Sequence, residues 1–262
     1  MNVINSGTDH MVDSARHTVA GDRVNTTAAG TTHPGKAPVA ANATASIAQA
    51  EPVGHHSGPT YAGAVHAGTW VVGLAAAAGA TPELGDSHAE ITAAYADHAA
   101  RAITQAVMVH GLAAGALVVL GVALLTRARR DHDTASRFAG RAGVTAGVLA
   151  MVQLGLELLA ITTADRAEPN ATGVLHDLVQ HLDGIKMFAL AALAVATSIA
   201  SHRTPLLRHW EAVIGYALAA TITVSGAGYL LLYPPLAQAA LLSLPLLLVW
   251  ILLLGRALTH RP

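Results

Sequence analysis

The stretch AGVTAGVLAMVQLGLELLAITT, residues 142–163, decides the fold class of this chain. A helix of about twenty apolar residues crosses the ~30 Å hydrocarbon core of a bilayer, because each residue adds about 1.5 Å. The stretch therefore predicts a membrane-spanning helix. Its single ionisable side chain is Glu157, and a carboxyl group at that place needs a reason.

Apolar windows of the same length recur beyond residue 60. Hydrophobic residues make up 53% of the chain and charged residues 12%, whereas a soluble domain is about 25% charged. We therefore predict an all-α fold, a polytopic transmembrane helical bundle of about six spans. The first span is the weakest, since it is mostly Ala and Gly and contains His66. The expected spans are 61–80, 103–126, 142–163, 184–201, 210–232 and 236–255.

The chain divides into a tail, a membrane domain and a short end. Residues 1–60 are rich in Ala, Thr and Gly and have no helical periodicity, so they bury too little apolar surface to offset the entropy of ordering. We expect a disordered cytoplasmic tail. No basic segment leads into an apolar run near Met1, which argues against a signal peptide. The six-span domain is expected over 61–257, and 258–262 form a short cytoplasmic end.

The arrangement of arginines predicts the orientation in the cell membrane. Basic loops stay in the cytoplasm, and the loops 127–141 and 202–209 and the C-terminal end are basic. The loops 82–102 and 164–183 are acidic and are expected outside. The N- and C-termini are then both cytoplasmic. The arginines on the inner side are Arg127, Arg129, Arg130, Arg137, Arg141, Arg203, Arg208, Arg256 and Arg261.

Composition and motifs limit the function. The chain has no cysteine, which excludes disulfides and thiolate metal sites, and a net charge of -1 argues against a nucleic-acid partner. No HExxH, Walker A, dinucleotide-binding or nucleophile-elbow motif is present. These observations favour a non-enzymatic protein with no cofactor. The lipid bilayer is the expected partner. A homo-oligomer, a partner in a membrane complex and the identity of a small-molecule ligand all stay open.

Both acidic loops are expected to contain short helices. In 86–102, Ser87 and Glu90 have the spacing of a capping box, in which each side chain satisfies a backbone N–H of the first turn. In GVLHDLVQHLDG, residues 173–184, apolar residues form one stripe, and His176, Asp177, Gln180 and His181 form the other face. This pattern predicts a helix that lies on the membrane surface or caps the bundle.

Ionisable residues of three consecutive spans lie at similar depth toward the outer side. Glu157 and His110 are each six or seven residues from an outer helix end, or about 10 Å at helical rise. Asp183 lies at the outer rim, and Lys186 lies one turn further in. A carboxylate in hydrocarbon costs about 2.5–3.5 kcal/mol, so we expect Glu157 to be protonated or paired with Lys186 or His110. The predicted outward-facing polar pocket consists of His110, Glu157, Lys186, Gln153 and Asp183.

Structural explanations compete with this pocket. Lys186 can extend its four-carbon chain to the outer surface. His110 can be a neutral core histidine bonded to a carbonyl, and Glu157 can tie two helices together without binding anything. His66 is expected in the cytoplasmic half of the first span with a structural role.

The histidines allow a metal site only weakly. His66 and His110 are expected on opposite sides of the bilayer, which excludes them as a pair of haem ligands at one depth. A zinc site needs three protein ligands at about 2 Å. The candidates near the outer face are His110, His181 and Asp183, with His176 and Asp177 nearby, but His176 and His181 diverge around their helix.

Several segments resemble known membrane proteins. DSHAEITAAYADHAARA at 86–102, with Tyr95, Asp97 and His98, is similar to a motif of uncharacterised actinobacterial multi-span membrane proteins, the DUF4386-like group. LDGIKMFALAALAVA at 182–196 and GYALAATITVSGAGYLLL at 215–232 resemble the same group. The resemblance implies a six-span protein without an assigned activity. HAGTWVVGL at 66–74 also resembles the first span of copper-resistance D-type proteins.

Two functional hypotheses follow. The first is a non-enzymatic membrane protein, namely a small-molecule or ion binder or a transport or envelope component, which uses the outward-facing pocket. The second is a membrane-embedded metal or redox protein that uses the outer histidines.

Overall fold

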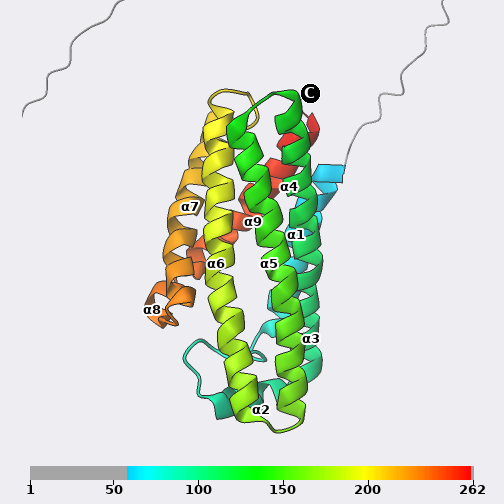
Figure 1. Ribbon diagram of the computed structural model, residues 1–262, viewed down its shortest axis with the longest axis vertical. Coiled ribbons are helices and arrows are strands. Elements are labelled where there is room, and N and C mark those ends of the chain that lie inside the picture. The colour runs from blue at the N-terminus through cyan, green and yellow to red at the C-terminus, as the bar shows by residue number, and fades with distance from the viewer. Residues whose placement is uncertain (1–57, 261–262) are drawn as a thin grey trace, which may run out of the picture. The chain divides into compact units, whose positions relative to one another are not determined.

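The computed structural model describes residues 58–260, and this part of the chain is a helical bundle without β-strands (Figure 1). The predicted all-α fold is confirmed. Residues 1–57 and 261–262 lie outside the described residues. The disorder expected over 1–60 falls almost wholly on them, although α1 already begins at Gly58.

The helices follow one another with short connections, and two of them are more than thirty residues long. The segments α3, η1 and α4 form one continuous rod, in which η1 is a turn of π-helix. The bounds are α1 Gly58–Ala77, α2 His88–Asp97, α3 Ala99–Ala106, η1 Val107–Leu112, α4 Ala113–Arg130, α5 Thr134–Asp165, α6 Pro169–Ser201, α7 His209–Leu230, α8 Pro234–Ala237 and α9 Ala240–His260.

Within the described residues, five helical stretches are long and apolar enough to cross a membrane. They indicate an integral membrane protein. The helix α1 packs on α4 and α9 but is not among the five, because its Gly, Thr and His residues lower its mean hydropathy. The five stretches are Ala99–Arg130, Thr134–Asp165, Pro169–Ser201, His209–Leu230 and Pro234–Thr259.

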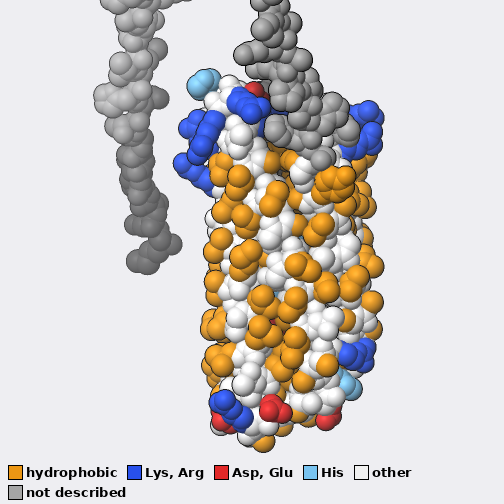
Figure 2. Space-filling view, turned by 90° about the vertical axis from the view of Figure 1, so that its right-hand side faces the viewer, with side chains coloured by type: hydrophobic (Ala, Val, Ile, Leu, Met, Phe, Trp, Pro, Cys, Tyr) orange, Lys and Arg blue, Asp and Glu red, His pale blue; other side chains and the backbone are white. Residues whose placement is uncertain are grey.

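The two ends of the bundle differ in charge. We call the end with Arg130, Arg203 and Arg208 the arginine-rich end and the end with α2 and α8 the acidic end. On the face drawn in Figure 2, hydrophobic side chains cover the middle, and charged side chains gather above and below them. Such an apolar belt between polar ends suits a bilayer, whose hydrocarbon core excludes charge.

Local sequence signals set where several helices begin. The predicted capping box of α2 is confirmed, since Glu90 accepts the backbone N–H of Ser87 at 2.8 Å and the Ser87 hydroxyl accepts the N–H of Glu90. Hydrogen bonds from the Ser87 side chain and backbone hold the pKa of Glu90 below its usual value. The helix α5 begins after Asp133, whose carboxylate accepts backbone N–H groups of Ala135 and Ser136.

The prediction of a separate surface helix over 173–184 is wrong. These residues form the first half of α6, which continues without a break to Ser201. The exposed and buried faces also differ from the prediction: Val174 and Leu178 are exposed, whereas His176 is buried. Gly184, which the pattern placed at a helix end, instead lies inside α6 in close contact with α7.

Close helix contacts depend on small residues. A Cβ added to Gly184 would lie 2.7 Å from the carbonyl oxygen of Gly226, so α6 and α7 are in backbone contact there. At the arginine-rich end, a Cβ added to Gly63 of α1 would lie 2.9 Å from the carbonyl oxygen of Ile251 in α9. Lipid provides no hydrophobic drive between helices, so such van der Waals contacts stabilise the bundle.

Candidate functional site

A cavity of about 770 Å³ lies among α1, η1, α5, α6, α7 and α9, in the half of the bundle nearer the acidic end. This volume is within the range of ligand sites, about 300–1,000 Å³. Four members of the sequence-predicted pocket line it, and Gln153 lies behind them, bonded to Asp183. The polar lining residues include Tyr95, Gln105, His110, Glu157, His176, Gln180, Asp183, Lys186 and Tyr229.

His110 and Glu157 face each other across the cavity wall. The Nε2 atom of His110 lies 3.4 Å from Oε2 of Glu157, and both side chains are almost fully buried. This distance is longer than that of an ordinary N–H···O hydrogen bond, so the two groups are in contact without a hydrogen bond between them. Of the two partners expected for Glu157, the structure therefore places His110 at pairing distance.

Lys186 pairs with Asp183, three residues earlier on α6. Gln153 of α5 supports this pair, because its Nε2 donates to Asp183 Oδ1 and to the carbonyl of Val179, both at 3.0 Å. The Lys186 side chain is only 6% exposed, so it does not extend to the outer surface. Asp183 and Lys186 thus compensate each other's charge inside the bundle.

The π-helical turn η1 contains His110. The N–H of Ala113 donates to the carbonyl of Met108, five residues earlier, instead of to the usual acceptor four residues earlier. A π-turn inserts one residue into the helical register, and such turns are frequent at functional sites. This irregularity is a feature of the site that sequence periodicity did not reveal.

His66 lies close to His110 along the bundle. Its Nδ1 is 2.9 Å from the carbonyl oxygen of Ala113, one turn from His110, and the side chain is buried. The expectation that the two histidines lie on opposite sides of the bilayer is therefore wrong. The depth of α1 is set by its packing at Gly63 and at Gly73, which contacts Val109, and a weak apolar window does not predict such packing.

The helix α2 covers the acidic end of the cavity. Its Tyr95 hydroxyl is 3.1 Å from His176 Nδ1, and His176 Nε2 is 3.0 Å from Gln180 Nε2. Burial raises the pKa of the Tyr95 phenol, so Tyr95 stays protonated at neutral pH. The sequence pattern placed His176 on an exposed polar face, and only the packing of α2 on α6 reveals it as a lining residue.

Several buried polar atoms at the cavity have no hydrogen-bond partner among the described residues. They are Glu157 Oε2, Gln105 Oε1 and His110 Nδ1, and Gln153 Oε1 behind them is also unpaired. An unpaired buried polar group costs about 1–3 kcal/mol, and most such groups in proteins have partners. Their concentration at one cavity indicates groups that a ligand or water completes.

The weak metal candidates do not converge. His181 lies 2.9 Å from the carbonyl oxygen of Leu230 and does not line the cavity. In residues 58–260, no group of three or more His, Asp or Glu side chains is arranged to hold a metal ion. The ring nitrogens of His66 and His110 that lack partners are Nε2 and Nδ1, respectively.

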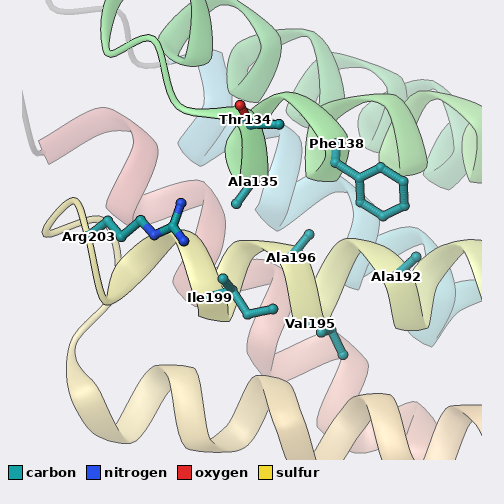
Figure 3. A pocket seen from close by; sticks show the side chains of 8 residues that line it. All are labelled: Thr134, Ala135, Phe138, Ala192, Val195, Ala196, Ile199 and Arg203. Carbon is teal, nitrogen blue, oxygen red and sulfur yellow. The ribbon is translucent and has the colours of Figure 1, made fainter. Parts of the chain in front are cut away.

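A second hollow, of about 410 Å³, lies between α5 and α6 at the arginine-rich end (Figure 3). Phe138, Ile199 and Val195 line it, and Arg203 lies at its end. Its walls are mostly apolar and contain no buried acceptor without a partner among the described residues. The larger cavity is therefore the candidate site.

No protein-family model, curated protein or solved structure matches the chain.

Proposed function

We propose that the protein is a multi-pass protein of the cell membrane, in which α1 is a sixth span beside the five apolar helices. The arginine-rich end would face the cytoplasm, and both termini would lie there. The positive-inside rule supports this orientation. The course of α1 supports the sixth span, since Thr60 bonds Thr259 of α9 at the arginine-rich end and Arg101 bonds the carbonyl of Ala78 at the acidic end.

We further propose that the protein binds a small molecule or ion in the cavity, from the outer side of the membrane. The observation that carries this proposal is a set of buried polar atoms on Glu157, Gln105 and His110, without hydrogen-bond partners among the described residues, at the wall of a 770 Å³ cavity. Ionisable groups in membrane spans are costly and usually functional. If Glu157 only linked two helices, these polar atoms would not be expected to lack hydrogen bonds beside a cavity.

The test is ligand-dependent stabilisation of the purified protein. Small amines, alcohols, carboxylic acids, alkali cations and divalent cations are screened by thermal unfolding, because a ligand that binds only the folded state raises Tm. We expect one class to raise Tm and Glu157→Gln to abolish the shift. Glu211→Gln is the matched control, since Glu211 is buried but does not line the cavity. Equal shifts in both variants, or no shift by any class, would contradict the proposal.

A membrane-embedded metal or redox protein is the second candidate. It is favoured by His66, which contacts the carbonyl of Ala113 one turn from His110, and by one ring nitrogen on each histidine that has no hydrogen-bond partner among the described residues. Imidazole nitrogen suits zinc, copper, iron and nickel. Metal analysis and an absorbance spectrum of the purified protein test this candidate. A stoichiometric metal that is lost in both His66→Ala and His110→Ala would support it.

A further inference from the structure

The walls of the cavity have two chemical characters. The polar wall comes from η1, α5 and α6, with His110, Glu157 and Lys186. Apart from Ser243, the lining from α1 and α9 is apolar and includes Trp70, Leu74, Ala77, Leu241, Leu244 and Leu247. A ligand that fills the whole volume must satisfy hydrogen bonds at one end and bury hydrocarbon at the other.

The helices α1 and α9 are in contact at one end and separate toward the other. At the arginine-rich end, Thr60 Oγ1 lies 2.7 Å from Thr259 Oγ1, and Gly255 leaves room for the backbone of Pro59. Toward the acidic end both helices line the cavity instead, because α9 runs obliquely across the bundle (Figure 1). We call the place where Leu74 and Ala77 of α1 and Leu241 and Leu244 of α9 line the cavity together the α1–α9 portal.

The portal reaches the outside of the bundle at an apolar surface. Leu241 is 82% exposed and Leu74 is 43% exposed, although both also line the cavity. At the acidic end, α2 and the loop at 81–84 line the cavity with Tyr95, Leu84 and the exposed Glu83. Leu241 and Leu74 thus give the cavity an apolar side that faces lipid.

The polar wall offers acceptors rather than free cations. Lys186 is already paired with Asp183, so it does not offer a free charge to an anionic head group. Among the described lining residues, the buried oxygens without a hydrogen-bond partner are Glu157 Oε2 and Gln105 Oε1. A head group that donates hydrogen bonds and carries positive charge compensates both, because charge-assisted hydrogen bonds to a carboxylate are the strongest available there.

On the basis of the proposed binding function, we propose that the ligand is an aliphatic amine with a hydrocarbon chain, which enters from the lipid through the α1–α9 portal. Its ammonium group lies against Glu157 and Gln105. Its chain lies along Trp70, Leu244 and Leu247.

The test uses dodecylamine and the protein in phosphatidylcholine nanodiscs. Trp70 lines the cavity, so binding changes its fluorescence, and the Trp70→Phe protein gives the baseline for probe that only enters the lipid. We expect a saturable Trp70-dependent change with dodecylamine. Binding weakens about tenfold or more in Glu157→Gln, which corresponds to the loss of one charge-assisted interaction. Lauric acid, with a chain of the same length and an anionic head, gives no saturable change.

Butylamine separates the inference from the proposed function. If butylamine binds as tightly as dodecylamine and depends on Glu157, the cavity is a binding site but the hydrocarbon part of the inference is wrong. If lauric acid binds as well as dodecylamine, the amine part is wrong. If neither amine gives a saturable change, the inference is wrong, and the wider solute screen decides the proposed function by itself.

Phenylalanine substitutions at two alanines of α1 test the portal. Ala77 lines the cavity and Ala75 does not, although both lie in the last turns of the same helix. We expect Ala77→Phe to slow dodecylamine binding about tenfold by narrowing the portal, and Ala75→Phe to leave it unchanged. Equal rates in the two variants would exclude lateral entry at this place.

Discussion

His110 Nε2 and Glu157 Oε2 lie 3.4 Å apart, buried on two neighbouring helices, and neither side chain pairs with Lys186 at that distance. The π-turn that contains His110 lies on one side of this contact, and α5 provides Glu157 on the other. The cavity therefore has two separate side-chain contacts, His110 with Glu157 and Lys186 with Asp183. Separate pairs are expected to respond differently to mutation.

The Asp183–Lys186 pair should show strong coupling. Either Asp183→Leu or Lys186→Met alone leaves a buried charge and should destabilise the protein by about 3–5 kcal/mol. The double variant should recover much of this loss, with a coupling energy of about 0.5–3 kcal/mol in a double-mutant cycle of unfolding free energies. The control is Asp131→Ala, which breaks a pair with Arg127 at the arginine-rich end and should cost below about 1 kcal/mol. Additive effects at Asp183 and Lys186 would rule out the pair.

A methyl group at Gly184 should disturb the contact between α6 and α7. Its Cβ would lie 2.7 Å from the backbone oxygen of Gly226, and backbone cannot move aside cheaply, so Gly184→Ala should cost about 1–3 kcal/mol. Gly155→Ala is the matched control, because nothing lies within 4 Å of its Cβ position. It should be neutral or stabilising by up to about 1 kcal/mol. Thermal unfolding of the two variants in one detergent checks the difference, and equal shifts would contradict the close contact.

Asp133 should stabilise α5 in a pH-dependent way. Burial alone would raise the pKa of Asp133, but hydrogen bonds from the Ser136 hydroxyl and from the backbone of Ser136 and Ala135 outweigh burial and lower it. Its contribution is thus complete above the usual Asp value of 3.8 and is lost as the pH falls through the lower folded value. Asp133→Ala should cost about 0.5–2 kcal/mol at pH 7. The difference in unfolding free energy between the variant and the wild type should become smaller below pH ~3. A difference that grows there would contradict this role.

Single cysteines should report the orientation, since the chain has none of its own. Arg130 and Asn170 are exposed at opposite ends of the bundle. If the arginine-rich end is cytoplasmic, a membrane-impermeant thiol reagent applied to intact cells labels Asn170→Cys and not Arg130→Cys. Labelling of Arg130→Cys alone would invert the topology. Permeabilised cells, in which both should react, provide the control.

The hydrophobic windows predicted the apolar helices well, because a span must satisfy its backbone hydrogen bonds internally and expose apolar side chains to lipid. They placed the helix ends less well. The span expected over 184–201 begins at Pro169, since hydropathy marks where charge becomes costly and not where the helix ends. Counting residues from the outer helix ends placed Glu157 and His110 at similar depth in the membrane. Depth alone did not distinguish Lys186 from His110 as the partner of Glu157.

By itself, the sequence determined that the chain forms a bundle of apolar helices with one basic and one acidic end, and that ionisable residues of consecutive spans lie at similar depth. These properties follow from segment length, composition and charge, which can be read from each part of the sequence without knowing which segments contact each other. Only the tertiary structure decided which polar groups meet, that His66 lies near His110, and that α1 and α9 separate around a cavity. Rotation, tilt and register of helices depend on close contacts such as Gly63 with Ile251 and Gly184 with Gly226, and these contacts exist only between segments far apart in the chain.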